Sequence, residues 1–140
     1  MFHYFGEGTL PETLVIKGKV FSGSGEGAKY VKLPWVKKQI AAKCGFTPYP
    51  GTLNVRLVEK NFVLKDLAKK VKAVEISSKE GFCRGVCFRA IFKDSTECVI
   101  VLPEITGYPD NIVEIVAPVN LREKFGLKDG ETVEVKIVLE

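Results

Sequence analysis

The residues that could do chemistry begin with Thr52 and Asn54, two neutral oxygen donors separated by one residue. They follow residues 45–51, whose prolines and glycines fix the shape of a loop. A strand is expected over Thr52 to Leu57. Because side chains alternate across a strand, Thr52 and Asn54 share one face, with Cα atoms roughly 6.6 Å apart. One ion can bridge such a pair, and hard neutral oxygens suit Mg²⁺ when phosphates balance its charge. The alternative is two polar residues that face solvent at the start of an amphipathic strand.

A glycine-rich loop precedes this pair, with glycines at positions 23, 25 and 27 of the segment 22–28. Its spacing formally matches a dinucleotide-binding fingerprint, which requires a helix directly after the loop and an acidic residue about 20 positions later. We expect no helix to open at once, because residues 31–34 (Val-Lys-Leu-Pro) intervene, and the next acidic residue after Glu26 is Glu59. Glycines still allow backbone N–H groups to converge on phosphate oxygens. A flexible hairpin turn is the alternative.

A carboxylate interrupts an apolar strand that is expected over Ile112–Val116. Glu114 shares its face with two β-branched apolar residues, the first and last of that strand. Such a local inconsistency tends to mark a functional site, where a carboxylate can orient or accept a proton. The alternative is an exposed edge strand with a mixed face.

Length and composition limit the class of protein. The 140 residues have 46 % hydrophobic and 27 % charged content, which is ordinary for one globular domain over residues 1–140. No run of 18 apolar residues and no export signal is seen, so we expect a cytoplasmic protein without a membrane partner. Residues 1–72 carry 13 Lys and Arg against 5 Asp and Glu. This half could attract a nucleotide or nucleic acid, or it could be a solvated lysine-rich face.

Short strands and one clear helix would position these residues. The helix is predicted over Pro34–Cys44, since proline suits a first turn and Gly45 can end it. The strands follow one another too closely for repeated βαβ units. The fold class is therefore mostly all-β, a small antiparallel barrel with one inserted α-helix and a short C-terminal helix at Leu121–Phe125. The expected strands are Thr13–Phe21, Thr52–Leu57, Val71–Ile76, Phe82–Phe92, Glu97–Leu102, Ile112–Val116 and Thr132–Leu139.

Three segments together resemble one family, the archaeal CTP-dependent riboflavin kinases. They are residues 23–27 (Gly-Ser-Gly-Glu-Gly), residues 45–54 and residues 115–123, and their order and spacing fit over residues 14–139. The resemblance implies a six-stranded cradle-loop (RIFT-related) barrel. It also implies transfer of the γ-phosphoryl group of CTP to the terminal ribityl hydroxyl of riboflavin, which gives FMN and CDP.

The resemblance also implies roles for single residues. Thr52 and Asn54 would bind Mg²⁺, Thr106 and Glu114 would contact the flavin nucleotide, and Glu114 would orient or deprotonate the hydroxyl. The residues that would bind the nucleotide are Gly23, Ser24, Gly25, Glu26, Gly27, Ala28, Val119, Asn120, Leu121 and Arg122. A basic residue can occur in relatives where this chain has Ala28, so either Lys29 or Arg122 could neutralise phosphate. The chain shows no winged-helix extension of the kind that some relatives carry, so we expect no second role as a regulator. We also expect a monomer.

Two other functions remain open on the sequence. A small basic barrel could be a nucleic-acid-binding module, although the chain shows no stripe of alternating basic and aromatic residues. A flavin carrier without catalysis would bind FMN and be indifferent to CTP.

Overall fold

The computed structural model describes residues 4–5, 8–9, 13–23, 26–58, 73–77, 85–93, 95–103 and 111–139. Thr106, Ser24 and Gly25 lie outside these ranges, and so do the predictions made for them. The strands are β1 (Tyr4–Phe5), β2 (Gly8–Thr9), β3 (Thr13–Phe21), β4 (Leu53–Leu57), β5 (Val74–Ile76), β6 (Gly85–Phe92), β7 (Thr96–Pro103), β8 (Ile112–Val116) and β9 (Thr132–Val138). The helices are α1 (Glu26–Val31), α2 (Pro34–Cys44) and α4 (Leu121–Phe125).

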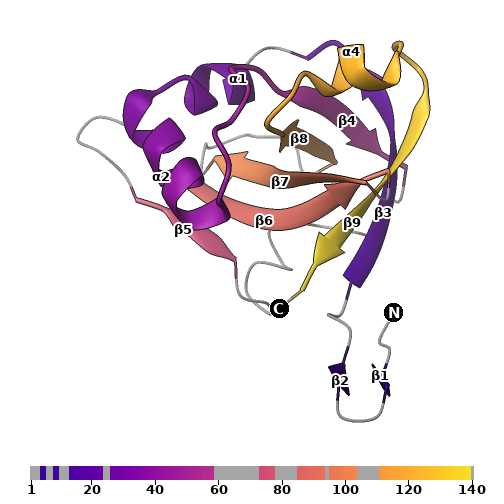
Figure 1. Ribbon diagram of the computed structural model, residues 1–140. Coiled ribbons are helices and arrows are strands. Elements are labelled where there is room, and N and C mark those ends of the chain that lie inside the picture. The colour runs from indigo at the N-terminus through magenta and orange to yellow at the C-terminus, as the bar shows by residue number, and fades with distance from the viewer. Residues whose placement is uncertain are drawn as a thin grey trace.

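Six antiparallel strands close into a barrel in the order β6-β7-β8-β4-β3-β9, and the pairing of β9 with β6 completes the circle (Figure 1). Strand β5 pairs with β6 outside this circle, and β1 pairs with β2 in a separate hairpin. Closure leaves the six barrel strands without an unpaired edge. The prediction of a small, mostly antiparallel barrel is confirmed, and its strand bounds hold to within a few residues over the described ranges.

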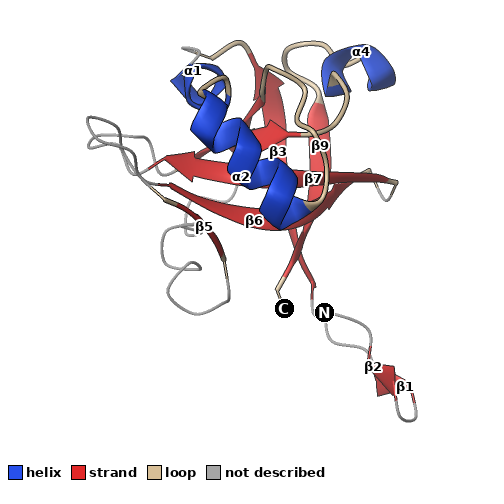
Figure 2. Ribbon diagram, turned by 60° about the vertical axis from the view of Figure 1, so that its left-hand side comes forward, coloured by secondary structure: helices blue, strands red, loops and turns tan. Residues whose placement is uncertain are grey.

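The alternating pattern of each strand sorts its side chains between two cores. One set fills the barrel and includes Val55, Phe88 and Ile115. The other set faces outward from β5 to β8 and meets the buried side of α2, where Val36 and Ile40 lie (Figure 2). The helix is therefore held on the outside of the barrel by apolar burial.

The ends of helix α2 follow from the sequence as predicted. Pro34 occupies the first turn, where its missing N–H costs no hydrogen bond. Gly45 ends the helix in the left-handed region with φ of 85°, and its N–H donates to the carbonyl of Ala41 at 3.2 Å. This stop turns the chain into the loop that leads to β4.

The prediction that no helix opens after the glycine loop is wrong. Helix α1 begins at Glu26, inside the segment 22–28 that was expected to be a loop, and precedes the turn at residues 32–33. Tyr30 and Val31 are both buried in the outer core, and the Tyr30 ring meets the Trp35 ring edge-on at a centroid distance of 6.0 Å. This tertiary burial stabilises a turn whose glycine content disfavours helix.

Within the described ranges, no helix has both the length and the apolar character needed to cross a membrane.

Candidate functional site

Thr52, Asn54 and Glu114 meet on the outer face of the barrel. Asn54 in β4 lies directly opposite Glu114 in β8. The Thr52 hydroxyl donates a hydrogen bond to Oε1 of Glu114 at 2.7 Å. Because Leu53 and Val55 point into the barrel core, Thr52 and Asn54 share the opposite face, as predicted. Two oxygen donors from one strand thus lie beside a carboxylate from the next.

The carboxylate of this group is buried. Glu114 is only 2 % exposed, and its strand lies between β7 and β4 in the middle of the sheet order. The alternative of an exposed edge strand with a mixed face is therefore wrong. A buried carboxylate needs partners, and the Thr52 hydroxyl is one of them.

The glycine loop begins against the same group. Phe21, the last residue of β3, pairs with Asn54, so the chain leaves the sheet next to that side chain. A Cβ atom at Gly23 would lie 2.5 Å from Oδ1 of Asn54, closer than such atoms approach in real structures. A larger residue here would push the Asn54 amide aside, and with glycine the backbone at residue 23 packs directly against that amide. Three segments that are distant in sequence therefore converge: residue 23, residues 52–54 and Glu114.

Thr52 and Asn54 are oxygen donors at this cluster that a metal ion could use. The described residues include no group of three or more His, Cys, Asp or Glu that could hold a metal. Thr52 and Asn54 offer two hard, neutral oxygens on one face, and the Gly23 backbone packs closely against the Asn54 amide. Mg²⁺ commonly takes few protein ligands and completes its shell with phosphate oxygens and waters. These residues fit such an ion.

A cavity of about 310 Å³ opens next to the cluster and includes Thr52 in its wall. Segments from α1, from the loop before β4 and from the start of α4 surround it. Five of the residues predicted to bind nucleotide line it, namely Ala28, Val119, Asn120, Leu121 and Arg122. Gly23 lies against Asn54 instead, and only the backbone of Glu26 and Gly27 is described. The structure therefore brings one predicted metal ligand and half of the predicted nucleotide residues to one hollow.

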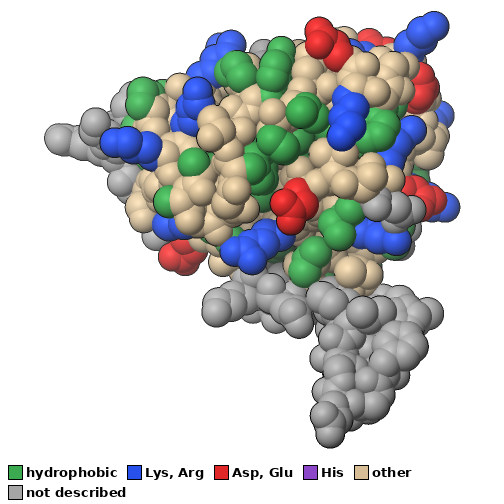
Figure 3. All heavy atoms as spheres, in the orientation of Figure 1, with side chains coloured by type: hydrophobic (Ala, Val, Ile, Leu, Met, Phe, Trp, Pro, Cys, Tyr) green, Lys and Arg blue, Asp and Glu red, His purple; other side chains and the backbone are tan. Residues whose placement is uncertain are grey.

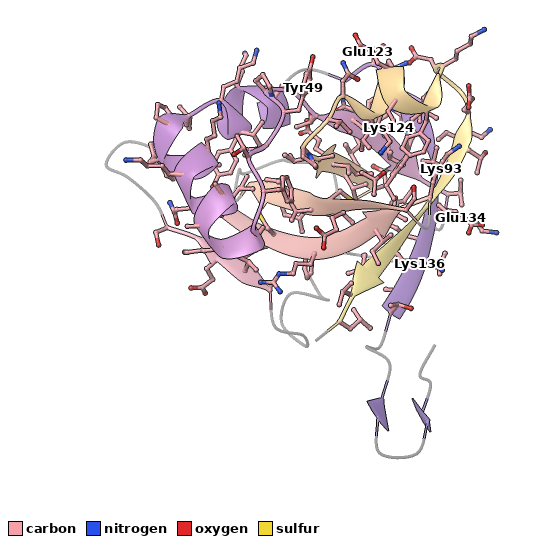
Figure 4. The ribbon with its side chains drawn as sticks, viewed as in Figure 1. Tyr49, Lys93, Glu123, Lys124, Glu134 and Lys136 are labelled. Carbon is pink, nitrogen blue, oxygen red and sulfur yellow. The ribbon has the colours of Figure 1, made fainter. Side chains whose placement is uncertain are left out.

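Tyr49 ties the two walls of this cavity together. Its N–H donates to the carbonyl of Ala117 at 2.8 Å, and its hydroxyl accepts from Nδ2 of Asn120 at 3.2 Å. A Cβ at Gly51 would lie 3.2 Å from the Tyr49 ring, so the ring folds over that glycine. The side chain is 39 % exposed and lies on the α1 and α4 side of the barrel (Figure 4). The proline and glycine content of the loop thus serves to place this aromatic ring.

Two cations line the cavity, Lys32 and Arg122. The Arg122 guanidinium pairs with Oδ1 of Asp129 at 3.0 Å and also donates to the carbonyl of Leu127. The other oxygen of Asp129 accepts from the Ser22 hydroxyl at 2.9 Å. The hydrogen bond from Ser22, followed by that from Arg122, lowers the pKa of Asp129 below its ordinary value.

Sequence reasoning missed Lys32 and gave no separate role to Tyr49. Lys32 follows Ala28 by four positions, and its N–H donates to the Ala28 carbonyl at 3.2 Å, so the two residues stand one helical turn apart. Recognition of α1 as a helix would have placed Lys32 on the same side as Ala28. The hydroxyl and ring of Tyr49 gave no comparable signal.

The fold and the site define a small closed β-barrel with a polar cavity next to helices α1 and α4 and a buried carboxylate beside that cavity. A family model called CTP-dep_RFKase, described as "Domain of unknown function DUF120", matches residues 20–137. The chain belongs to this family.

Individual relatives carry the name riboflavin kinase. The chain is 42 % identical over 130 residues to the riboflavin kinase of Archaeoglobus fulgidus, an alignment that covers 91 % of this chain and 56 % of that protein. It is 42 % identical over 132 residues to that of Pyrobaculum islandicum, covering 89 % of this chain and 61 % of the relative. For Methanosarcina barkeri the identity is 38 % over 130 residues, with 90 % and 57 % covered. The chain therefore spans somewhat more than half the length of these relatives.

Proposed function

We propose that the chain is a CTP-dependent riboflavin kinase that uses Mg²⁺ and converts riboflavin and CTP into FMN and CDP. The observation that carries the proposal is the 2.7 Å hydrogen bond from Thr52 to Glu114. It joins Thr52, a metal-type oxygen donor in the cavity wall, to the buried carboxylate of Glu114, which lies opposite the second donor, Asn54. The family name and the names of the relatives support the same activity and suggest CTP as the phosphate donor.

The residues suit phosphoryl transfer because this reaction depends mainly on positioning and charge stabilisation. The terminal ribityl oxygen attacks the γ-phosphorus of CTP, and the bond from that phosphorus to the β–γ bridging oxygen breaks. The hydroxyl proton passes to the Glu114 carboxylate, and CDP leaves with the bridging oxygen. Thr52 and Asn54 would hold Mg²⁺, which when bound neutralises charge on the phosphates.

Glu114 suits the role of base because its environment fixes it in place. Its strand is paired on both sides, and the Thr52 hydroxyl donates to one of its oxygens. A base must be held next to the hydroxyl that it deprotonates, and the paired strands and the Thr52 contact hold the Glu114 carboxylate beside the cavity wall. The flavin would contact Glu114 and Thr106, while the nucleotide would occupy the cavity and the glycine loop, Gly23 to Ala28.

The surface gives less support to a nucleic-acid-binding module. On the face shown in Figure 3, Lys and Arg side chains are spread among other residues and do not gather into one patch. A protein that binds the phosphate backbone of nucleic acid usually presents a continuous basic stripe or groove.

The proposal is tested by incubating the chain with riboflavin, Mg²⁺ and each of the four nucleoside triphosphates in turn, with both products followed by chromatography. We expect FMN and CDP in equal amounts with CTP, and little FMN with the other three. FMN formed equally well from ATP would refute the CTP preference. Absence of FMN with every nucleotide would refute the kinase. In that case, tight binding of added FMN would indicate a carrier, and a salt-dependent gel shift a nucleic-acid module.

A further inference from the structure

The cavity has an uneven set of charged side chains. Among the described residues that line it, none is Asp or Glu, and the cations are Lys32 and Arg122. Arg122 is already held by Asp129, so this pair adds little net charge to the cavity. Within the described part of the chain, the Lys32 ammonium forms no ion pair, and the side chain is exposed. Lys32 therefore supplies the uncompensated positive charge.

The position of Lys32 relative to Ala28 lets this charge reach the end of the glycine loop. The two residues stand one helical turn apart, where Cβ atoms lie about 5–6 Å from each other. Ala28 has a small side chain and also lines the cavity, so it does not block the long side chain of Lys32 along that wall. Ala28 is the last residue of the segment Gly23–Ala28, which is proposed to hold the phosphates.

We propose that Lys32 binds the phosphate chain of the nucleotide and makes binding depend on the number of phosphates. This inference rests on the proposed function, since it assumes that the cavity holds a nucleotide. An ammonium group acts on phosphate as a point charge on a flexible stem. Its effect should therefore grow with the charge of the ligand, from cytidine through CDP to CTP.

The test is calorimetric titration of CTP, CDP and cytidine into the parent and into variants. Lys32→Met removes the charge and keeps most of the stem, and we expect it to weaken CTP binding about fivefold, CDP binding less, and cytidine binding not at all. Lys32→Arg should restore CTP binding to within about twofold of the parent, because charge and not shape is at issue. Lys38→Met removes an exposed charge from α2 that does not line the cavity, and it should behave as the parent does.

The outcomes separate this inference from the proposed kinase. If Lys32→Met binds CTP as the parent does, or weakens cytidine equally, the inference is wrong even when the parent makes FMN. If the parent makes no FMN but loses CTP affinity selectively in Lys32→Met, the inference stands and the kinase fails. A parent that binds none of the three ligands overturns both.

Discussion

Replacement of Glu114 by glutamine tests the centre of the proposed mechanism. The substitution keeps the size of the side chain and one oxygen that can accept the Thr52 hydrogen bond of 2.7 Å. It removes the charge and the basicity. Because Glu114 is only 2 % exposed, the change also removes a buried charge, so we expect the melting temperature to be equal or higher.

The magnitude follows from the absence of a substitute base. Among the described residues, no Asp or Glu lines the cavity, and Glu114 is the carboxylate that the Thr52 hydroxyl in its wall contacts. A positioned base contributes about 10²–10⁴ in rate, or roughly 2.7–5.4 kcal/mol of barrier. We therefore expect kcat of Glu114→Gln to fall at least about a hundredfold, while riboflavin affinity stays within about threefold of the parent.

The assay is steady-state FMN formation from riboflavin and CTP, with riboflavin binding measured separately by quenching of flavin fluorescence. The matched control is Glu134→Gln, the same change at an exposed carboxylate that pairs with Lys17 on the surface at 3.3 Å. Exposed pairs contribute little, so this variant should keep parental kcat and stability. A kcat of Glu114→Gln within a factor of three of the parent would refute the base role.

A second arm separates a base from a residue that only positions Thr52. If Glu114 acts through Thr52 alone, Thr52→Val and Glu114→Gln should lose the same activity, and the double variant should lose no more. If Glu114 is the base, Glu114→Gln should lose more than Thr52→Val.

Two further predictions concern the surroundings of the site. Gly23→Ala should raise the Mg²⁺ concentration for half-maximal FMN formation, because the added methyl group would displace the Asn54 amide. Asn54→Ala should raise it as well. If the magnesium titration of Asn54→Ala coincides with that of the parent, Asn54 is not a metal ligand. Asp129→Asn should lower the melting temperature at neutral pH, because the lowered pKa of Asp129 means that folding favours its ionised form. That stabilisation is present above the pKa of Asp129 in the unfolded chain and is lost as the pH falls through its pKa in the folded protein. The difference in melting temperature between variant and parent should therefore shrink below about pH 4. A difference that stays constant across the pH range would show that the Ser22 and Arg122 contacts stabilise the fold by packing instead.

Local features of the sequence were enough to predict the ends of helix α2 and the positions of most strands. Pro34 and Gly45 mark the two ends of α2 as expected, and the apolar run Ile112–Val116 marked a strand interrupted by one carboxylate. Helix α1 could not be found in the same way. Its segment contains glycine and is followed by Pro34, and only the burial of Tyr30 and Val31 against α2 and the sheet stabilises it. That miss also concealed Lys32.

The order and the register of the strands could not be predicted from the sequence, and these two features bring the site residues together. Thr52 and Glu114 are 62 positions apart, yet the pairing of β4 with β8 puts Asn54 opposite Glu114. A slip of one residue in that pairing would move the carboxylate to the barrel interior, because side chains alternate between the faces. The interior is filled by apolar side chains such as Val113 and Ile115, which would then be forced outward.

The cost of that slip therefore falls on the whole core of the barrel and not on the polar contact. A fully buried aliphatic side chain contributes about 1.5–3 kcal/mol by burial, while an ordinary hydrogen bond contributes about 0.5–1.5 kcal/mol. The apolar residues on either side of Glu114 thus fix the register, and the register brings the carboxylate to Thr52. Val113 and Ile115, which point into the barrel on either side of Glu114, are therefore the residues that position its carboxylate for chemistry.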